Sequence, residues 1–518
     1  MATCSPTPDR IIEPPAWRAD TLADSVVILL VWTVVQRAIG FVRAVLFCRW
    51  MDPAVLGQWD MAFGFLMLAA PVSVLALSSS LGRYVEHYWQ RRQLHSLLVR
   101  TAVATGLLAC ASALAMASAP QWFSHLIFNA PDQAGLVWLV AGTLPALVAF
   151  HYFVNLLSAL RNVRLLTALQ ALNSLAFAAM GIVLVLWWGA TAQSAIIAFA
   201  AANAICAACG VAWLAGRWRV LPADGPPPPR REMWSKLVPF AASVWMASLL
   251  ANLFDLADRY VIVHYLPGTP EEALAQAGNY HTSRVLPLLL VSIAGLLSPM
   301  ITPHLSRDWE EGRRERVSMR LNLYLKLLGL GMSAGAVAVL LAAPLLFGAV
   351  FQGKFAGGLA VLPGTLTYCV WFGMAMVAQN YLWCAEKARL GSLALAIGLS
   401  VKVALSLWLV PEIGLVGAVV AAGAAHLTAL VLILRFSRPF GLRTDLGTWI
   451  VLAVPVLFWL GPWAGAVVLI GLFAVTIATD RILSAEEKAH FLQAWFRYRA
   501  SFQRFRAALR PGPGGRAE

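Results

Sequence analysis

The residues of this sequence best suited to chemistry are charged side chains that lie deep inside long apolar stretches. Six of them share this placement: Arg37, Arg43, Asp255, Asp258, Arg284 and Lys402. The cations outnumber the carboxylates, so a cavity formed by these side chains would have a positive potential and would select an anion. Arginine in particular suits a phosphate, because its planar guanidinium group can donate to two oxygens at once. We therefore expect the four cations to bind a phosphorylated substrate.

A charge at the centre of a bilayer costs at least about 2.5–3.5 kcal/mol, so a charge retained there usually faces a water-filled cavity or a partner. Asp255 and Arg259, at i and i+4 on one helix, could instead form a purely structural pair. The carboxylates of Asp255 and Asp258 could also take up a proton or Na⁺ and change the local field, which makes them the candidates for ion coupling. Lys326, close to the end of its apolar stretch, is expected to extend its ammonium group to the membrane surface. No metal site and no other cofactor are expected.

The elements that must position these residues are membrane-spanning helices. Of the 518 residues 60% are hydrophobic and only 12% are charged, whereas about a quarter of the residues in a soluble domain are charged. Since a hydrocarbon core of about 30 Å requires about 20 apolar helical residues per crossing, the apolar runs predict an all-α polytopic membrane protein with about 14 transmembrane helices. The predicted crossings are 26–47, 55–79, 97–118, 135–160, 164–188, 192–215, 237–263, 283–303, 320–346, 359–383, 390–410, 413–435, 447–461 and 463–480. The last two are short, so twelve crossings and a re-entrant pair form the alternative.

Basic residues fall in alternate connections between these crossings. If the N-terminus is cytoplasmic, the inner connections carry most of the Arg and Lys residues, whereas the outer ones carry little beyond Arg49 and Lys354. This positive-inside bias predicts that both termini are cytoplasmic. The formal charge of +14 is explained by the same bias, because the cations lie on one side of the lipid bilayer. No nucleic acid is therefore expected as a partner.

The sequence matches itself weakly at an offset of about 221–225 residues. Gly57–Trp59 (glycine, amide, aromatic) corresponds to Gly278–Tyr280, and Asn155 corresponds to Asn380. The repeat therefore comprises six crossings, and an even number relates the two halves by an axis along the membrane normal. Two such halves would face one another around a central cavity, where Asn155 and Asn380 are further candidates for substrate binding.

The predicted organisation follows from this repeat. Its parts are an N-terminal cytoplasmic segment (1–24), an N-terminal six-helix lobe (25–218), a Pro-rich cytoplasmic linker (219–235), a C-terminal six-helix lobe (236–436), two additional transmembrane helices (437–483) and a basic amphipathic cytoplasmic tail (484–518). In the tail, Ser484 and Glu487 predict a capping box, and the basic helix after it, with its aromatic edge, is expected on the anionic leaflet. Cys206 and Cys209 are spaced C-x-x-C within an Ala-rich crossing, which indicates close packing of small residues and not a metal site.

The chain resembles bacterial polysaccharide flippases of the multidrug/oligosaccharidyl-lipid/polysaccharide exporter superfamily. The resemblance rests on two six-helix halves and on four short motifs: Gln36-Arg37-x-x-Gly40-Phe41-x-Arg43, Gly57-Gln58-Trp59, Asp258-Arg259 and Gly278-Asn279-Tyr280. It implies alternating access of two lobes and movement of an undecaprenyl-diphosphate-linked glycan across the bacterial cytoplasmic (inner) membrane. By this likeness, Arg37, Arg43 and Arg284 engage the diphosphate, while Asp255 or Asp258 couples an ion.

We therefore expect a transporter, not an enzyme, that flips a lipid-linked oligosaccharide for surface polysaccharide biosynthesis. A polysaccharide polymerase or glycosyltransferases are the candidate protein partners. A cation-coupled drug or metabolite antiporter of the same fold is the nearest alternative, and a cavity rich in acids would favour it. A membrane-embedded glycan polymerase or glycosyltransferase, with Asp255, Asp258, His264 and His281 as catalytic groups, is a further alternative. That class generally requires a larger outer loop than the segment 264–282 provides. A scaffold protein would leave the buried charges unexplained.

Overall fold

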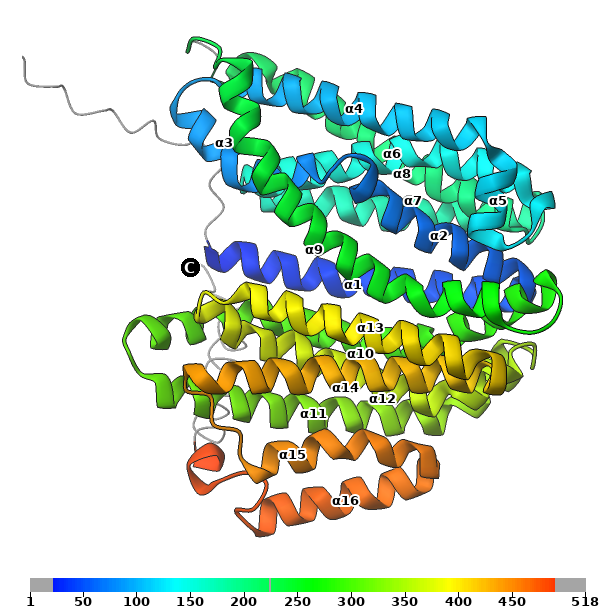
Figure 1. Ribbon diagram of the computed structural model, residues 1–518, viewed down its shortest axis with the longest axis vertical. Helices are drawn as coiled ribbons and strands as arrows, with labels where there is room; N and C mark the ends of the chain where they lie inside the picture. Colours follow the sequence, from blue (N-terminus) through cyan, green and yellow to red (C-terminus); the bar gives the residue numbers. More distant parts are fainter. Residues whose placement is uncertain (1–21, 223–224, 490–518) are drawn as a thin grey trace, which may run out of the picture. The chain divides into compact units, whose positions relative to one another are not determined.

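The computed structural model describes residues 22–222 and 225–489, and within these ranges the chain is helical and contains no strand (Figure 1). Twelve helices are long and apolar enough to cross a membrane. The all-α polytopic fold expected from the sequence is thereby confirmed. The N-terminal segment 1–21 and the aromatic and basic part of the tail, 490–518, lie outside the described residues.

The helices of the first half of the sequence include two short ones between the long ones. They are α1 (Leu22–Trp50), α2 (Pro53–Ser73), α3 (Leu81–Gln90), α4 (Leu94–Ser118), α5 (Pro120–Phe128), α6 (Ala134–Ala159), α7 (Val163–Trp187) and α8 (Ala192–Arg217). The second half contains α9 (Arg230–Tyr265), α10 (Pro270–Glu310), α11 (Arg314–Leu345), α12 (Ala356–Cys384), α13 (Ala388–Ile413), α14 (Leu415–Ser437), α15 (Leu446–Ala453) and α16 (Pro462–Ala478). Helix α9 begins inside the segment predicted as the linker, so only part of that segment is irregular.

Contacts within the chain divide it into two compact units, which we describe separately. The first unit comprises Met1–Leu289, Ala342–Thr365 and Ser392–Thr428, and the second comprises Leu290–Leu341, Leu366–Gly391 and Ala429–Glu518. The lobe boundaries given above stay a prediction.

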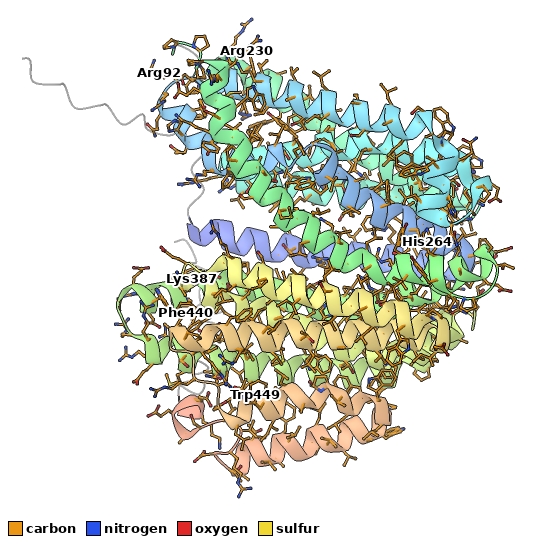
Figure 2. All side chains as sticks on the ribbon, in the orientation of Figure 1. Arg92, Arg230, His264, Lys387, Phe440 and Trp449 are labelled. Atoms are coloured by element: carbon orange, nitrogen blue, oxygen red, sulfur yellow. The ribbon has the colours of Figure 1, made fainter. Side chains whose placement is uncertain are left out.

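In the first unit, helices pack through small residues that let neighbouring side chains approach closely. A methyl group at Gly210 of α8 would lie 2.4 Å from the ring of Phe153 on α6, and one at Gly181 of α7 would lie 2.8 Å from Phe47 on α1. Helix association in lipid depends on this kind of van der Waals contact, because lipid is as apolar as the helix surfaces. Glycine at these two positions therefore holds α1, α6, α7 and α8 together. Figure 2 shows Arg92 and Arg230 at one end of this unit and His264 at the other.

Helix α2 ends earlier than the sequence predicts. The crossing expected over 55–79 is helical only to Ser73, and Leu75 and Ala76 then adopt left-handed conformations, with φ of 50° and 49°. A 3₁₀ turn, Leu77–Ser80, follows and leads into α3. The broken end is partly satisfied by side chains, since Trp245 Nε1 donates to the carbonyl oxygen of Val72 at 3.3 Å.

The second unit contains a buried ion-pair cluster that corrects the prediction for Lys326. This side chain is not extended to the protein surface. It is fully buried, and it bonds to Asp445, before α15, and to Glu487, the latter at 2.8 Å. Burial of Asp445 acts to raise its pKa, but hydrogen bonds from Lys326 and Thr448 outweigh burial and hold the pKa of this carboxyl below its usual range. The predicted capping box is confirmed, because Glu487 N–H donates to Ser484 Oγ at 3.2 Å and Ser484 N–H donates to Glu487 at 2.8 Å.

The predicted thirteenth and fourteenth crossings are shorter than the other twelve. Helix α15 continues only as a 3₁₀ segment, Val454–Leu460, and α16 has 17 residues. Their packing within the second unit is specific, since Trp371 Nε1 donates to the carbonyl oxygen of Leu452 and Thr367 Oγ1 to that of Pro455, both at 2.8 Å. Within the described ranges, twelve helices are therefore long and apolar enough to span, and α15 with its 3₁₀ extension and α16 are two shorter apolar helices.

Candidate functional site

Four helices of the first unit bring their charged side chains into one buried network. The network consists of Asp60 on α2, Asp255, Asp258 and Arg259 on α9, His281 and Arg284 on α10, and Lys402 on α13. Sequence reasoning named Asp255, Asp258, Arg284 and Lys402 as site residues. The structure brings all four together.

Asp255 accepts from two arginines. Arg259 lies 2.7 Å from one carboxylate oxygen, and Arg284 lies 2.5 Å from the other. The i, i+4 pair weighed as a structural alternative therefore exists, but it is extended by a second helix. The side chain of Asp255 is 59% exposed, while those of Arg259 and Arg284 are 4% and 9% exposed. Asp255 is thus the most exposed member of the network.

Asp258 is buried and pairs with Lys402. The two side chains are each 3% exposed, and Lys402 Nζ lies 2.7 Å from Asp258 Oδ2. Tyr280 donates its hydroxyl to the same oxygen at 2.8 Å, and Lys402 also donates to the carbonyl oxygen of Phe254 at 2.6 Å. A buried charge is tolerated when its partners replace the lost water. These bonds provide that replacement at Oδ2 of Asp258, whereas its buried Oδ1 has no hydrogen-bond partner among the described residues.

Asp60 is a member of the network that sequence reasoning missed. Its side chain is 3% exposed and lies 2.7 Å from His281 Nδ1 and 3.4 Å from Arg259 Nη1. The signal that could have revealed it is the internal repeat, because the offset of 221 that aligns Gly57 with Gly278 also aligns Asp60 with His281. The side chains at these equivalent positions contact each other, as equivalent positions do across a twofold axis.

The two glycines of the repeat contact each other in the same way. A methyl group at Gly57 would lie 1.9 Å from the carbonyl oxygen of Leu274, and one at Gly278 would lie 2.0 Å from that of Pro53. The beginnings of α2 and α10 therefore touch backbone to backbone through equivalent residues. Reciprocal contacts of this kind are what a parallel repeat predicts. We call the contact formed by Gly57, Gly278, Asp60 and His281 the α2–α10 contact.

The charges of the network balance, so the network itself offers no excess of cations for binding an anion. Its arginines and lysine are Arg259, Arg284 and Lys402, and its carboxylates are Asp60, Asp255 and Asp258. In the count made from sequence, Arg284 and Lys402 are matched by Asp255 and Asp258, and Arg259 and Asp60 add one charge of each sign. Of the four cations named from the sequence, the two that lie outside this network are both on α1.

Arg37 and Arg43 are these two cations. Arg43 is half-buried with its guanidinium carbon 3.9 Å from the ring centre of Phe177, which is a cation–π contact and leaves the charge without a counter-ion. Arg37 is exposed, and no carboxylate of the described chain lies within ion-pair distance of it. These two arginines are the ones free to receive an anionic group.

The two asparagines of the repeat keep equivalent polar contacts in separate units. Asn155 donates to Ser78 Oγ at 3.1 Å in the first unit. Asn380, which is fully buried in the second unit, accepts from Thr302 at 2.7 Å and donates to Ser298 Oγ at 2.8 Å. Asn380 thus has its hydrogen-bonding capacity used within its own unit.

Comparison with known sequences places the chain in a family. Residues 22–308, more than half of the chain, match the family described as "Polysaccharide biosynthesis protein". The chain belongs to this family. It is also 28% identical over 202 residues to the "Uncharacterized membrane protein YabM" of Bacillus subtilis (strain 168), and that match covers 38% of this chain and 37% of the relative.

Solved structures show that this member of the polysaccharide biosynthesis family has a transporter fold. The "Lipid II flippase MurJ, inward closed conformation" superposes with a TM-score of 0.68 at 12% identity, covering 88% of this chain and 99% of that one. An inward-facing multidrug resistance MATE transporter of the MOP superfamily superposes with a TM-score of 0.62 at 14% identity, covering 78% and 94%. A MOP superfamily transporter from Pyrococcus furiosus, described as having a binding pocket of reverse polarity, gives 0.55 at 12% identity, covering 81% and 94%. These likenesses show the fold, and that fold is one of transporters and flippases.

Proposed function

We propose that this family member flips a polyprenyl-diphosphate-linked oligosaccharide across the cytoplasmic membrane by alternating access, for surface polysaccharide biosynthesis. The observation that carries the proposal is the pair of arginines on α1 that no carboxylate neutralises, in a chain of the polysaccharide biosynthesis family with a MurJ-like fold. A diphosphate and sugars cannot cross hydrocarbon unaided, since each polar group loses its water there. Arg37 and Arg43 would replace part of that hydration.

The geometry divides the tasks of the charged residues differently from the sequence prediction. Arg37 and Arg43 bind the diphosphate, because they have no competing counter-ion. Arg284 and Lys402, which pair with Asp255 and Asp258, respond to the coupling ion. When Na⁺ or a proton neutralises Asp255, Arg284 loses this ion-pair partner, Arg259 keeps its pair with Asp60, and the balanced network gains positive charge.

Orientation follows the positive-inside bias in this proposal, with both termini cytoplasmic. The α2–α10 contact then lies at the outer end of the first unit, where it closes the path to the outside. Opening requires Gly57 and Gly278 to separate and the bond between Asp60 and His281 to break. Asp255 is coupled to the α2–α10 contact through Arg259, which bonds to both Asp255 and Asp60. Neutralising Asp255 therefore changes the strength of the ion pair between Arg259 and Asp60.

An antiporter for cationic drugs or metabolites is the second candidate. The exposed carboxylate of Asp255 and the MATE-like fold favour it. The free arginines on α1 oppose it, since a cationic substrate would be repelled by both. A membrane-embedded glycosyltransferase has less support, because Asp255 and Asp258 are both held in ion pairs and His264 is stacked on Tyr260 with a ring-centre distance of 3.9 Å.

Reconstitution into liposomes tests the proposal. Purified protein is incorporated with a fluorescent undecaprenyl-diphosphate sugar, and the fraction of label that becomes accessible to an added membrane-impermeant quencher is followed with time. We expect flipping by the wild type, a rate at least about tenfold lower for Arg37→Ala because a charge-assisted bond to phosphate is lost, and an unchanged rate for Arg49→Ala at the exposed end of the same helix. Equal rates for protein and protein-free liposomes would reject the function, and an unimpaired Arg37→Ala would reject the assignment of the diphosphate to α1.

A further inference from the structure

The first unit contains a pocket that is lined by both apolar and polar residues and that the charged network does not include. It has a volume of about 320 Å³ and lies at the break after α2, against α6 and α9. That volume is at the lower end of the range for pockets that bind small ligands. Its polar lining consists of six uncharged residues: Ser78, Ser79, His151, Asn155, Ser248 and Asn252. We call this site the α2-break pocket.

The break that forms this pocket is specific to the first half of the repeat. Helix α10 occupies the equivalent positions of the second half and runs unbroken from Pro270 to Glu310. Both halves nevertheless keep the polar contact of the equivalent asparagines, Asn155 with Ser78 and Asn380 with Thr302. The contact therefore does not require a broken helix. Irregular backbone in membrane proteins is retained where it lines a cavity or a binding site. The break after α2 is therefore a candidate binding site.

Several polar groups in the pocket lack a protein partner. Asn155 uses its amide nitrogen on Ser78, and Asn252 uses its own on the carbonyl oxygen of Ser248 at 2.8 Å. Across the described ranges, no protein group bonds to the side-chain oxygens of these two asparagines, to the hydroxyl of Ser79 or to the ring nitrogens of His151. Buried polar groups are normally hydrogen-bonded, so these half-buried groups are available to a ligand.

The chemistry of the lining selects the class of ligand. Amide, hydroxyl and imidazole groups can both donate and accept hydrogen bonds, and none of them carries a fixed charge. An ion would find no counter-ion among the lining residues, and an apolar group would leave them unsatisfied, whereas a sugar ring presents many hydroxyls that donate and accept. Asn252 also precedes Asp255 by three residues, on the same side of α9, so the pocket adjoins the charged network.

We propose that the α2-break pocket binds an uncharged sugar unit of the transported glycan. This inference deepens the proposed function and rests on it, because only the proposed function says that the sugar belongs to a lipid-linked glycan. The lipid-linked substrate is thereby recognised at two places, the diphosphate by α1 and a sugar ring by the pocket. Discrimination between glycans resides in the pocket, because the diphosphate is common to all of them.

Binding of free sugars tests the pocket without relying on transport. Saturation-transfer NMR is recorded on purified protein with glucose, galactose and N-acetylglucosamine at millimolar concentrations. We expect a signal from at least one sugar, weakened about tenfold in apparent affinity by Asn155→Leu and about threefold by Ser79→Ala, as the loss of one or two hydrogen bonds requires. Ser79→Ala breaks no bond within the protein, so it remains informative if Asn155→Leu fails to fold.

A matched control is Asn173→Leu, which removes a half-buried amide of α7 that bonds to Asn203 and does not line the pocket. Its affinity for the sugar should equal that of the wild type. Absence of any sugar signal, or equal weakening by Asn173→Leu and Asn155→Leu, would overturn the proposal and leave a water-filled pocket only. A sugar signal that behaves as expected, together with failed flipping in liposomes, would retain the pocket and reject the flippase function, so the two failures are distinguishable.

Discussion

Replacing Gly57 by alanine should force the α2–α10 contact apart. The added methyl group would lie 1.9 Å from the carbonyl oxygen of Leu274, and ordinary contact begins at 3.4 Å, so the helices must separate by about 3.4 − 1.9 = 1.5 Å. Asp60 lies one helical turn along α2, and a similar displacement would lengthen its 2.7 Å bond to His281 beyond hydrogen-bond range. Overpacking of this kind costs about 1–3 kcal/mol. Because about 1.4 kcal/mol is a factor of ten in population, the closed arrangement should lose about 5- to 150-fold in favour of an open one.

Double electron–electron resonance provides the assay. Nitroxide labels at Asp132 and Glu271, which are both exposed in the first unit, report the separation of the ends of the two halves. We expect Gly57→Ala, and equally Gly278→Ala, to move the distance distribution to longer values and to slow flipping. Gly142→Ala is the control, since no atom lies within 4 Å of its added methyl group. An unchanged distribution and rate for Gly57→Ala would refute the assignment of this contact as the closure.

Three further outcomes are expected. Asp60→Asn should destabilise the protein by about 3–5 kcal/mol, because the buried network then holds three cations against two carboxylates, and a melting temperature equal to that of the wild type would contradict the role of Asp60 in the network. Lys326→Met should be destabilising by a similar amount, since Glu487 then stays buried without its cation, and addition of Glu487→Gln should restore part of the loss. Because the pKa of Asp445 is lowered in the folded protein, its carboxylate contributes fully to stability above about pH 4, and this contribution is lost as the pH falls through the lowered pKa. The difference in melting temperature between wild type and Asp445→Asn should therefore be largest near neutral pH and shrink below about pH 4. A difference that does not change with pH would contradict this role of Asp445.

Much of the architecture could be predicted from the sequence because the bilayer imposes a length and a polarity on each helix. Apolar runs long enough to span the hydrocarbon core identified all twelve long helices. The offset that aligns Gly57 with Gly278 predicted the repeat, and the two glycines meet in the folded chain. Arg37 and Arg43 were recognised for the same reason, since a cation within an apolar run stands out without any knowledge of its neighbours.

What the sequence could not supply was the pairing of charges between helices. Lys326 meets Asp445 and Glu487, which lie 119 and 161 residues away along the chain, so its burial could not be inferred from its place near a helix end. Asp60 was overlooked because one acid near the start of a crossing resembles an interfacial residue until His281 is brought beside it. The sequence by itself determined where helices form and which charges are out of place, because hydrophobicity and period act locally. Only the tertiary structure decided which charges cancel and which stay free, because the energy of a buried charge depends on the distance to partners that distant segments supply.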